Sequence, residues 1–113
     1  MRMAPRRTLE SLIPQDRDLK ILKENANQVA DLIRALANNK RLLILFVLMS
    51  HGEMSVEPLA DTVGLSTSAL SQHLAKLRAK GLVKTRREAQ TIFYRLTQEM
   101  HIKHTLLSLQ RLF

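Results

Sequence analysis

The chain has 113 residues, of which 45% are hydrophobic and 25% charged, which is the balance of one folded domain and not of a disordered chain. It has no cysteine, no secretory signal pattern and no apolar run longer than Leu42–Met49, which excludes disulfides, thiolate sites and a membrane span and favours a cytoplasmic protein. The net charge is +8, and residues 62–98 carry seven Lys or Arg against Glu88 alone, so we expect a polyanionic partner, with nucleic acid favoured over an anionic membrane.

Residues 1–15 combine three arginines and two prolines with little periodicity, which predicts a basic N-terminal arm ahead of a domain over residues 16–113. From Asp16 the apolar positions recur every three or four residues, and acidic residues at this end suit the positive end of a helix dipole. We therefore expect a first helix with one apolar stripe, which ends before Asn38. The stripe comprises Leu22, Ala26, Val29, Ile33 and Leu36.

Three shorter helices are expected in the middle of the chain. The first segment fits a buried strand as well as a helix, but the asparagines before it and His51 followed by glycine after it favour a helix. Gly64 ends the second, because glycine accepts the positive φ of a helix exit, and Ser66 or Thr67 caps the third. The predicted ranges are Lys40–Ser50, Val56–Val63 and Thr67–Lys80.

Two short β-rich pieces, Leu82–Thr85 and Thr91–Leu96, flank a charged stretch over residues 86–90, which predicts a hairpin with a charged tip. A last helix is expected from about Gln98 to the end, with an apolar stripe that includes Leu112. Two short helices joined across Gly64 and followed by a hairpin form a winged helix-turn-helix. The expected fold class is mainly α with a small β-hairpin: four helices, two strands and a final helix.

The predicted helix over residues 67–80 buries its leucines and leaves short hydroxyls and an amide on its outer face, groups that suit base edges and phosphates in a groove. Lys76 lies further along this helix, and Arg86 and Arg87 lie at the hairpin, where cations suit phosphates. Each feature alone fits a helix cap or a solvated surface, but the combination favours DNA binding. The outer face carries Thr67, Ser68, Ser71 and Gln72.

The stretch from Ala35 to Leu96 resembles the ArsR/SmtB family of bacterial winged-helix repressors, through ALANNKRLLIL, VGLSTSALSQHLAKLRAKGLV and TRREAQTIFYRL. Within the family it is similar to the branch of the hemolysin, biofilm and nodulation regulators HlyU, BigR and NolR. The resemblance implies a homodimer that binds an imperfect inverted repeat of double-stranded DNA in a promoter. It also implies that the first and last helices form the dimer interface.

The resemblance also assigns residues. His73 joins the recognition helix but ranks below its neighbours, because it lies beside leucines that we expect to be buried. Arg41 matches an arginine that the family keeps at the start of its second helix, and for it we favour a structural salt bridge or a cap on a neighbouring loop. With Lys76, which is included for its charge and not by resemblance, the predicted DNA-binding residues of the recognition helix and wing are Thr67, Ser68, Ser71, Gln72, His73, Lys76, Arg86, Arg87, Gln90 and Thr91. The apolar stripes fit a dimer interface, or ordinary core packing, through Leu22, Val29, Ile33, Ile102, Leu106 and Leu109.

The family's sensing chemistry does not carry over. Arsenic and cadmium sensors hold a Cys-x-Cys where this chain has Ser55–Leu59, and sulfur sensors hold a cysteine where it has Phe46, so a dithiol switch is impossible. His101 and His104 share a helix face and are weak metal-ligand candidates, but the second half of the zinc sensors' ligand set is missing, and we interpret both as surface histidines. We predict no cofactor, and the sequence assigns no inducer, whether metal or small molecule.

The chain has no Gly-rich phosphate loop and no strained serine elbow, so we do not expect an enzyme. The predicted function is a sequence-specific, dimeric transcription regulator, most readily a repressor on an inverted-repeat operator. A winged-helix adaptor for protein contacts and a nonspecific architectural DNA binder are the alternatives. An adaptor does not need a basic hairpin, and only a regulator combines steep salt dependence with a preference for one sequence.

Overall fold

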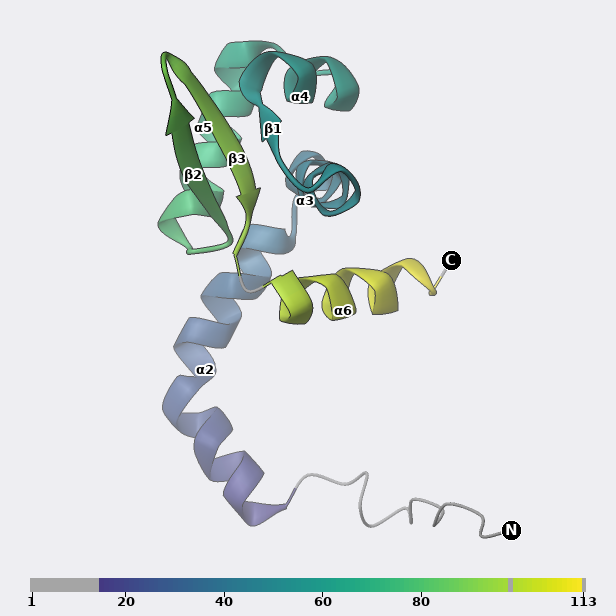
Figure 1. Cartoon of the computed structure of the whole chain (residues 1–113). Coiled ribbons are helices and arrows are strands. Elements are labelled where there is room, and N and C mark those ends of the chain that lie inside the picture. The colour runs from purple at the N-terminus through teal and green to yellow at the C-terminus, as the bar shows by residue number, and fades with distance from the viewer. Residues whose placement is uncertain (1–14, 98, 113) are drawn as a thin grey trace, which may run out of the picture. The chain divides into compact units, whose positions relative to one another are not determined.

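The computed structural model describes residues 15–97 and 99–112, with the side chains of residues 99–102 left out (Figure 1). The predicted arm therefore lies outside the described residues, except for Gln15. The chain divides into two compact units, residues 1–31 and residues 32–113, and the boundary between them falls inside the first described helix. Each unit is described by itself.

The first described helix, α2 (Asp16–Leu36), begins where the charge pattern predicts. The backbone N–H of Gln15 donates to the Asp18 carboxylate at 2.9 Å, which supplies an acceptor for the start of the helix. The predicted apolar stripe is largely exposed in the chain alone: Leu22 is 51% exposed and Ile33 58% exposed, and Ala35 is the buried residue of the helix.

Helix α3 (Asn39–His51) confirms the helical interpretation of the central apolar segment and rejects the strand. The side-chain oxygen of Asn38 accepts from the backbone N–H groups of Lys40 and Arg41 at 3.0 and 3.1 Å, so this cap fixes the start of the helix. At the other end, Nδ1 of His51 lies 3.0 Å from the carbonyl oxygen of Val47.

The helix-turn-helix consists of α4 (Val56–Val63) and α5 (Thr67–Ala79). Between them Gly64 adopts a left-handed conformation with φ 72° and ψ 39°, as the sequence predicts. Ser66, and not Thr67, caps α5, because its hydroxyl accepts from the backbone N–H of Ala69 at 3.1 Å. This tight exit and entry position the N-terminal turn of α5.

A three-stranded antiparallel sheet follows α5, in the order β1–β3–β2, from β1 (Met54–Ser55), β2 (Val83–Glu88) and β3 (Thr91–Leu96). The hairpin is confirmed, but the predicted tip over residues 86–90 is too long. The strands continue through the charged residues, since Arg86 pairs with Phe93 and Glu88 with Thr91, and the turn is reduced to Ala89 and Gln90. The short β1, which pairs with β3, was not predicted.

The last helix, α6 (Glu99–Gln110), packs against α3 and contributes Leu106 to one apolar core. No polar residue is buried in the described part of the chain. None of the described helices has the length and apolar character needed to cross a membrane. A helix-turn-helix followed by a β-hairpin makes residues 32–113 a winged helix, as expected. The core centres on Ile44, Leu45, Leu48, Leu59, Leu70, Leu74, Leu77 and Leu96.

Candidate nucleic-acid interface

Helix α5 presents a polar outer face because its buried residues all lie on the other side. Leu70, Leu74 and Leu77 are at most 1% exposed and anchor the helix on the core. At about 100° per residue, this anchoring turns the intervening side chains outward. The predicted contact residues Thr67, Ser68, Ser71, Gln72 and Lys76 are all exposed, whereas His73 is half-buried at the edge of the face.

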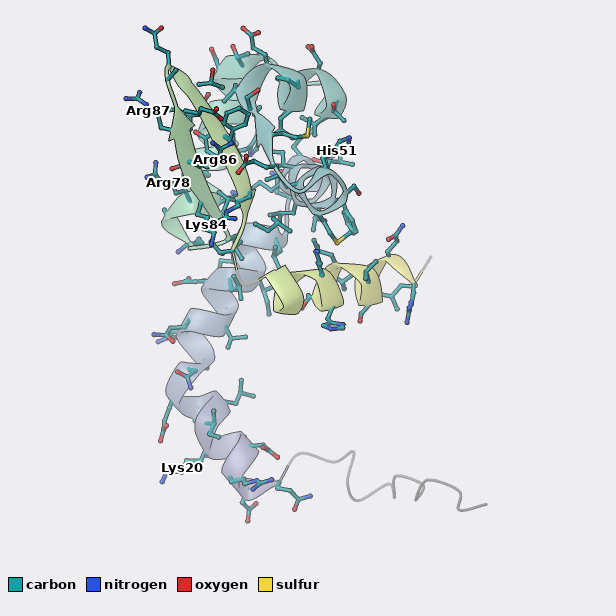
Figure 2. All side chains as sticks on the ribbon, in the orientation of Figure 1. Lys20, His51, Arg78, Lys84, Arg86 and Arg87 are labelled. Carbon is teal, nitrogen blue, oxygen red and sulfur yellow. The ribbon has the colours of Figure 1, made fainter. Side chains whose placement is uncertain are left out.

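The two arginines of the wing lie on opposite faces of the sheet. Side chains alternate along a strand, so Arg87 shares a face with the buried Val83, which packs toward α5. Arg86 lies on the other face with Phe93, its cross-strand partner. Figure 2 shows Arg87 projecting away from the wing and Arg86 turned across the sheet.

Arg86 is held by protein groups in this structure. Its Nη2 lies 2.6 Å from Oε1 of Glu53, its Nη1 lies 2.9 Å from Oε2 of Glu88, and its guanidinium lies 4.6 Å from the ring centre of Phe93. The hydrogen bond from Arg86 lowers the pKa of Glu53, and those from Arg86 to Glu53 and Glu88 raise the pKa of Arg86. We call this arrangement of Arg86, Glu53, Glu88 and Phe93 the wing clamp.

Sequence reasoning missed Glu53. It lies 33 residues before Arg86, in the connection between α3 and β1, and no local pattern joins the two. The signal that could have found it is the sheet itself: once β1 pairs with β3, Ser55 lies opposite Phe93, and the residues just before β1 come next to Arg86.

Two open grooves border the wing. One has a volume of about 480 Å³ and lies between α5 and β3, where Ser71, Arg78 and Tyr94 are among its lining residues. The other, of about 540 Å³, lies between the wing tip and the start of α4, and Gln90 and Thr91 line it. The predicted wing residues Gln90 and Thr91 are thus exposed at the tip, away from the outer face of α5.

A group of basic side chains lies where α3 meets α5. The pKa of His73 is lowered, mainly because the ring is partly buried and further because Arg41, Lys76 and Lys40 place positive charge near it. Nδ1 of His73 and Nε of Arg41 are buried and have no hydrogen-bond partner among the described residues. The salt bridge expected for Arg41 is not found within the described residues.

The apolar residues expected at a dimer interface divide between surface and core. On α2, Leu22, Val29 and Ile33 are exposed, and on α6 Leu109 is 42% exposed. Leu106, however, is 1% exposed and packs in the core of its own chain, because the side of α6 that carries it faces α3. Ile102 lies outside the residues whose side chains the structure describes. Five more large apolar residues are exposed: Leu19, Ile21 and Leu32 on α2, Leu107 on α6, and Leu112 just after α6.

The weak metal candidates stay untested. His104 is exposed on α6, and the side chain of His101 lies outside the described residues. Within the described part of the chain, no three His, Asp or Glu side chains cluster in a way that could hold a metal ion. Phe46 is partly buried and packs against the core.

Comparison with known proteins gives a consistent result. Residues 38–85 match the model of a family described as "Bacterial regulatory protein, arsR family". The nodulation protein NolR of Rhizobium meliloti is 55% identical over 80 residues, which are 71% of this chain and 65% of that protein, so the chain spans just under two thirds of this relative. The transcriptional activator HlyU of Vibrio cholerae is 45% identical over 96 residues, 85% of this chain and 87% of that protein. The crystal structure of NolR from Sinorhizobium fredii superposes with a TM-score of 0.73 at 49% identity, covering 80% of this chain and 89% of that one.

Proposed function

This chain belongs to the ArsR family of bacterial regulatory proteins, and we propose that it is a homodimeric transcription regulator that represses a promoter by binding an inverted-repeat operator. The observation that carries this proposal is the exposed polar face of α5 beside a basic wing, in a chain of net charge +8. The protein acts in the bacterial cytoplasm, where its DNA lies, and performs no catalysis.

Helix α5 enters the major groove of each half-site. The groove is wide enough for a helix, and its base edges present donors and acceptors that hydroxyl and amide groups read. Gln72 is the strongest candidate for a base reader, because an amide can both donate and accept. Ser68 and Ser71 lie on the same exposed face and supply shorter contacts.

The dimer forms through the apolar residues that the single chain leaves exposed on α2 and α6. Ile33 and Leu109 are 58% and 42% exposed in the single chain, and a second copy that covers them would remove this apolar surface from water. A two-fold dimer places its two recognition helices about 34 Å apart, which predicts half-sites one helical turn apart on the DNA.

The regulator works without thiol chemistry, because the chain has no cysteine. Release from DNA then depends on another ligand, on a partner protein or on the concentration of the regulator itself. The exposed His104 and its neighbour His101 make zinc the metal to test first.

The experiment that tests the proposal is DNA binding by the purified protein to its own upstream region, footprinted and titrated with salt, with and without zinc. A protected inverted repeat, bound far more tightly than unrelated DNA, is the expected result. Binding of all sequences with equal strength indicates an architectural protein, and absence of DNA binding indicates a protein-interaction adaptor. Release by zinc assigns the two histidines as ligands.

Replacement of Gln72 by alanine tests the assigned base reader. We expect Gln72→Ala to weaken operator binding by about 1–3 kcal/mol and to relax the preference at one base pair of each half-site. Gln28→Ala, which removes an exposed amide on α2 outside the apolar stripe, is the matched control. Equal weakening of operator and unrelated DNA by Gln72→Ala would assign the amide to the phosphate backbone instead.

A further inference from the structure

The basic side chains at the contact of α3 and α5 have no acidic partner among the residues that the structure describes. His73 lies within the influence of Arg41, Lys76 and Lys40, and none of these three cations forms an ion pair with a residue that the structure describes. We call the group the α3–α5 basic cluster; it comprises Lys40, Arg41, His73 and Lys76.

Such a cluster is unfavourable in the free protein. Like charges that lie close together repel one another, and partial burial removes the water that would screen them. The buried Nε of Arg41 and Nδ1 of His73 add two polar atoms that have no hydrogen-bond partner among the described residues, and a buried polar atom without a partner costs free energy. An anion placed against the cluster removes the repulsion, so this arrangement indicates a site for an anionic group.

The position of the cluster on α5 identifies that group. Ser71 and Arg78 lie on the side of α5 that lines the groove with β3, next to the wing. His73 and Lys76 lie on the opposite side of α5, next to α3. The exposed outer face of α5 separates these two sides. A helix in the major groove has one phosphate backbone on each side, so Arg78 and the wing meet one strand and the cluster meets the other.

We propose that the α3–α5 basic cluster is a second phosphate-binding site, which holds the DNA backbone on the side of the recognition helix away from the wing. The site rests on the proposed function, since its ligand is the backbone of the bound operator. It assigns a DNA contact to two residues of α3, Lys40 and Arg41, outside the helix-turn-helix and the wing.

The salt dependence of operator binding tests the site. Each phosphate contact contributes about 0.9 to the slope of log K against log salt, and a dimer makes each contact twice. Lys40→Ala and Lys76→Ala should therefore each lower the slope by about 1.8, with little change in sequence preference. Lys20→Ala, which removes the same charge from an exposed position on α2 (Figure 2), should leave the slope unchanged. Unchanged slopes in both cluster variants would overturn the proposal.

A measurement on the intact protein gives a second test. The pKa of His73, followed by NMR with and without operator DNA, should rise on binding, because a phosphate then offsets the neighbouring cations. An unchanged pKa in a saturated complex would place the backbone elsewhere. Binding by the wild-type protein separates the two proposals. If the wild type shows no preference for one DNA sequence, the proposed regulator function is refuted. If it prefers an operator but the cluster variants keep the wild-type salt slope, only the second phosphate-binding site is refuted.

Discussion

Arg86 and Arg87 are neighbours in sequence, but their side chains lie on opposite faces of the sheet and have different surroundings. Arg86 is held in the wing clamp by Glu53 and Glu88, while Arg87 lies on the face of the sheet that packs toward α5. Removal of Arg87 should therefore remove a phosphate contact, and removal of Arg86 should instead alter the position of the wing. The two substitutions delete the same charge and so serve as controls for each other.

The magnitude follows from counterion release. One lost contact per protomer lowers the salt slope of a dimer by about 1.8. When salt rises fourfold, from 50 to 200 mM, the factor by which operator affinity falls should therefore be about twelve times smaller for Arg87→Ala than for the wild type. Arg86→Ala should weaken binding at every salt concentration and keep the wild-type slope. Glu53→Ala combined with Arg86→Ala should bind no more weakly than Arg86→Ala alone, because both residues act through one clamp.

Fluorescence anisotropy with labelled operator, at four or more salt concentrations, measures both the affinity and the slope. We expect a flattened slope for Arg87→Ala alone. If Arg86→Ala flattens the slope as much as Arg87→Ala does, Arg86 contacts phosphate in the complex and the clamp opens on binding. If neither variant changes the slope, the wing does not touch the DNA backbone.

Three further predictions concern stability and pH. Gly64→Ala should lower the free energy of unfolding, measured with urea at fixed protein concentration, by about 1–2 kcal/mol, because φ is 72° there. A Cβ at this position would meet no atom within 4 Å, so the cost comes from the backbone conformation. Gly64→Asn should cost less, because asparagine tolerates this conformation, and an equal loss in both variants would indicate an unseen clash. Leu74→Ala should lower the free energy of unfolding by about 2–5 kcal/mol, because the Leu74 side chain is only 1% exposed. Leu109→Ala, at an exposed position, should chiefly raise the dimer dissociation constant measured by sedimentation. The reverse pattern would contradict the assigned core. Because the pKa of Glu53 is lowered, the wing clamp should be intact above the ordinary carboxyl pKa and should be lost as the pH falls through the lowered value. The NMR resonance of the Arg86 Nε–H should therefore stay constant at neutral pH and shift only in acid. A shift near pH 7 would exclude the ion pair.

The helices were predictable because their signals are local. The caps at Asn38 and Ser66 and the exit at Gly64 each depend on a few adjacent residues, and the apolar spacing selects which side of each helix is buried. The exposed polar face of α5 followed from the same spacing, since the positions of three leucines determine where the remaining side chains point.

The features that were missed depend on pairs of residues far apart in sequence. The charged stretch around Arg86 reads locally as a turn, and only its register with Phe93 shows that it continues the strand. Strand β1 is two residues long, too short for any periodicity, and Glu53 contacts Arg86 only because β1 joins β3. Leu106 belongs to the stripe of its helix, but spacing alone does not distinguish a neighbouring helix of the same chain from a second protomer.

The wing is fastened at its base as well as along its length. The hydroxyl of Thr97 donates to the carbonyl oxygen of Gly81, and the backbone N–H of Thr97 donates to the carbonyl oxygen of Leu82 at 3.0 Å. With Arg86 held against Glu53 further along, the hairpin is ordered before any DNA arrives. We therefore expect DNA binding to forfeit little conformational entropy in the wing, because Arg87 would approach the duplex on an ordered hairpin instead of a loop that must first be immobilised.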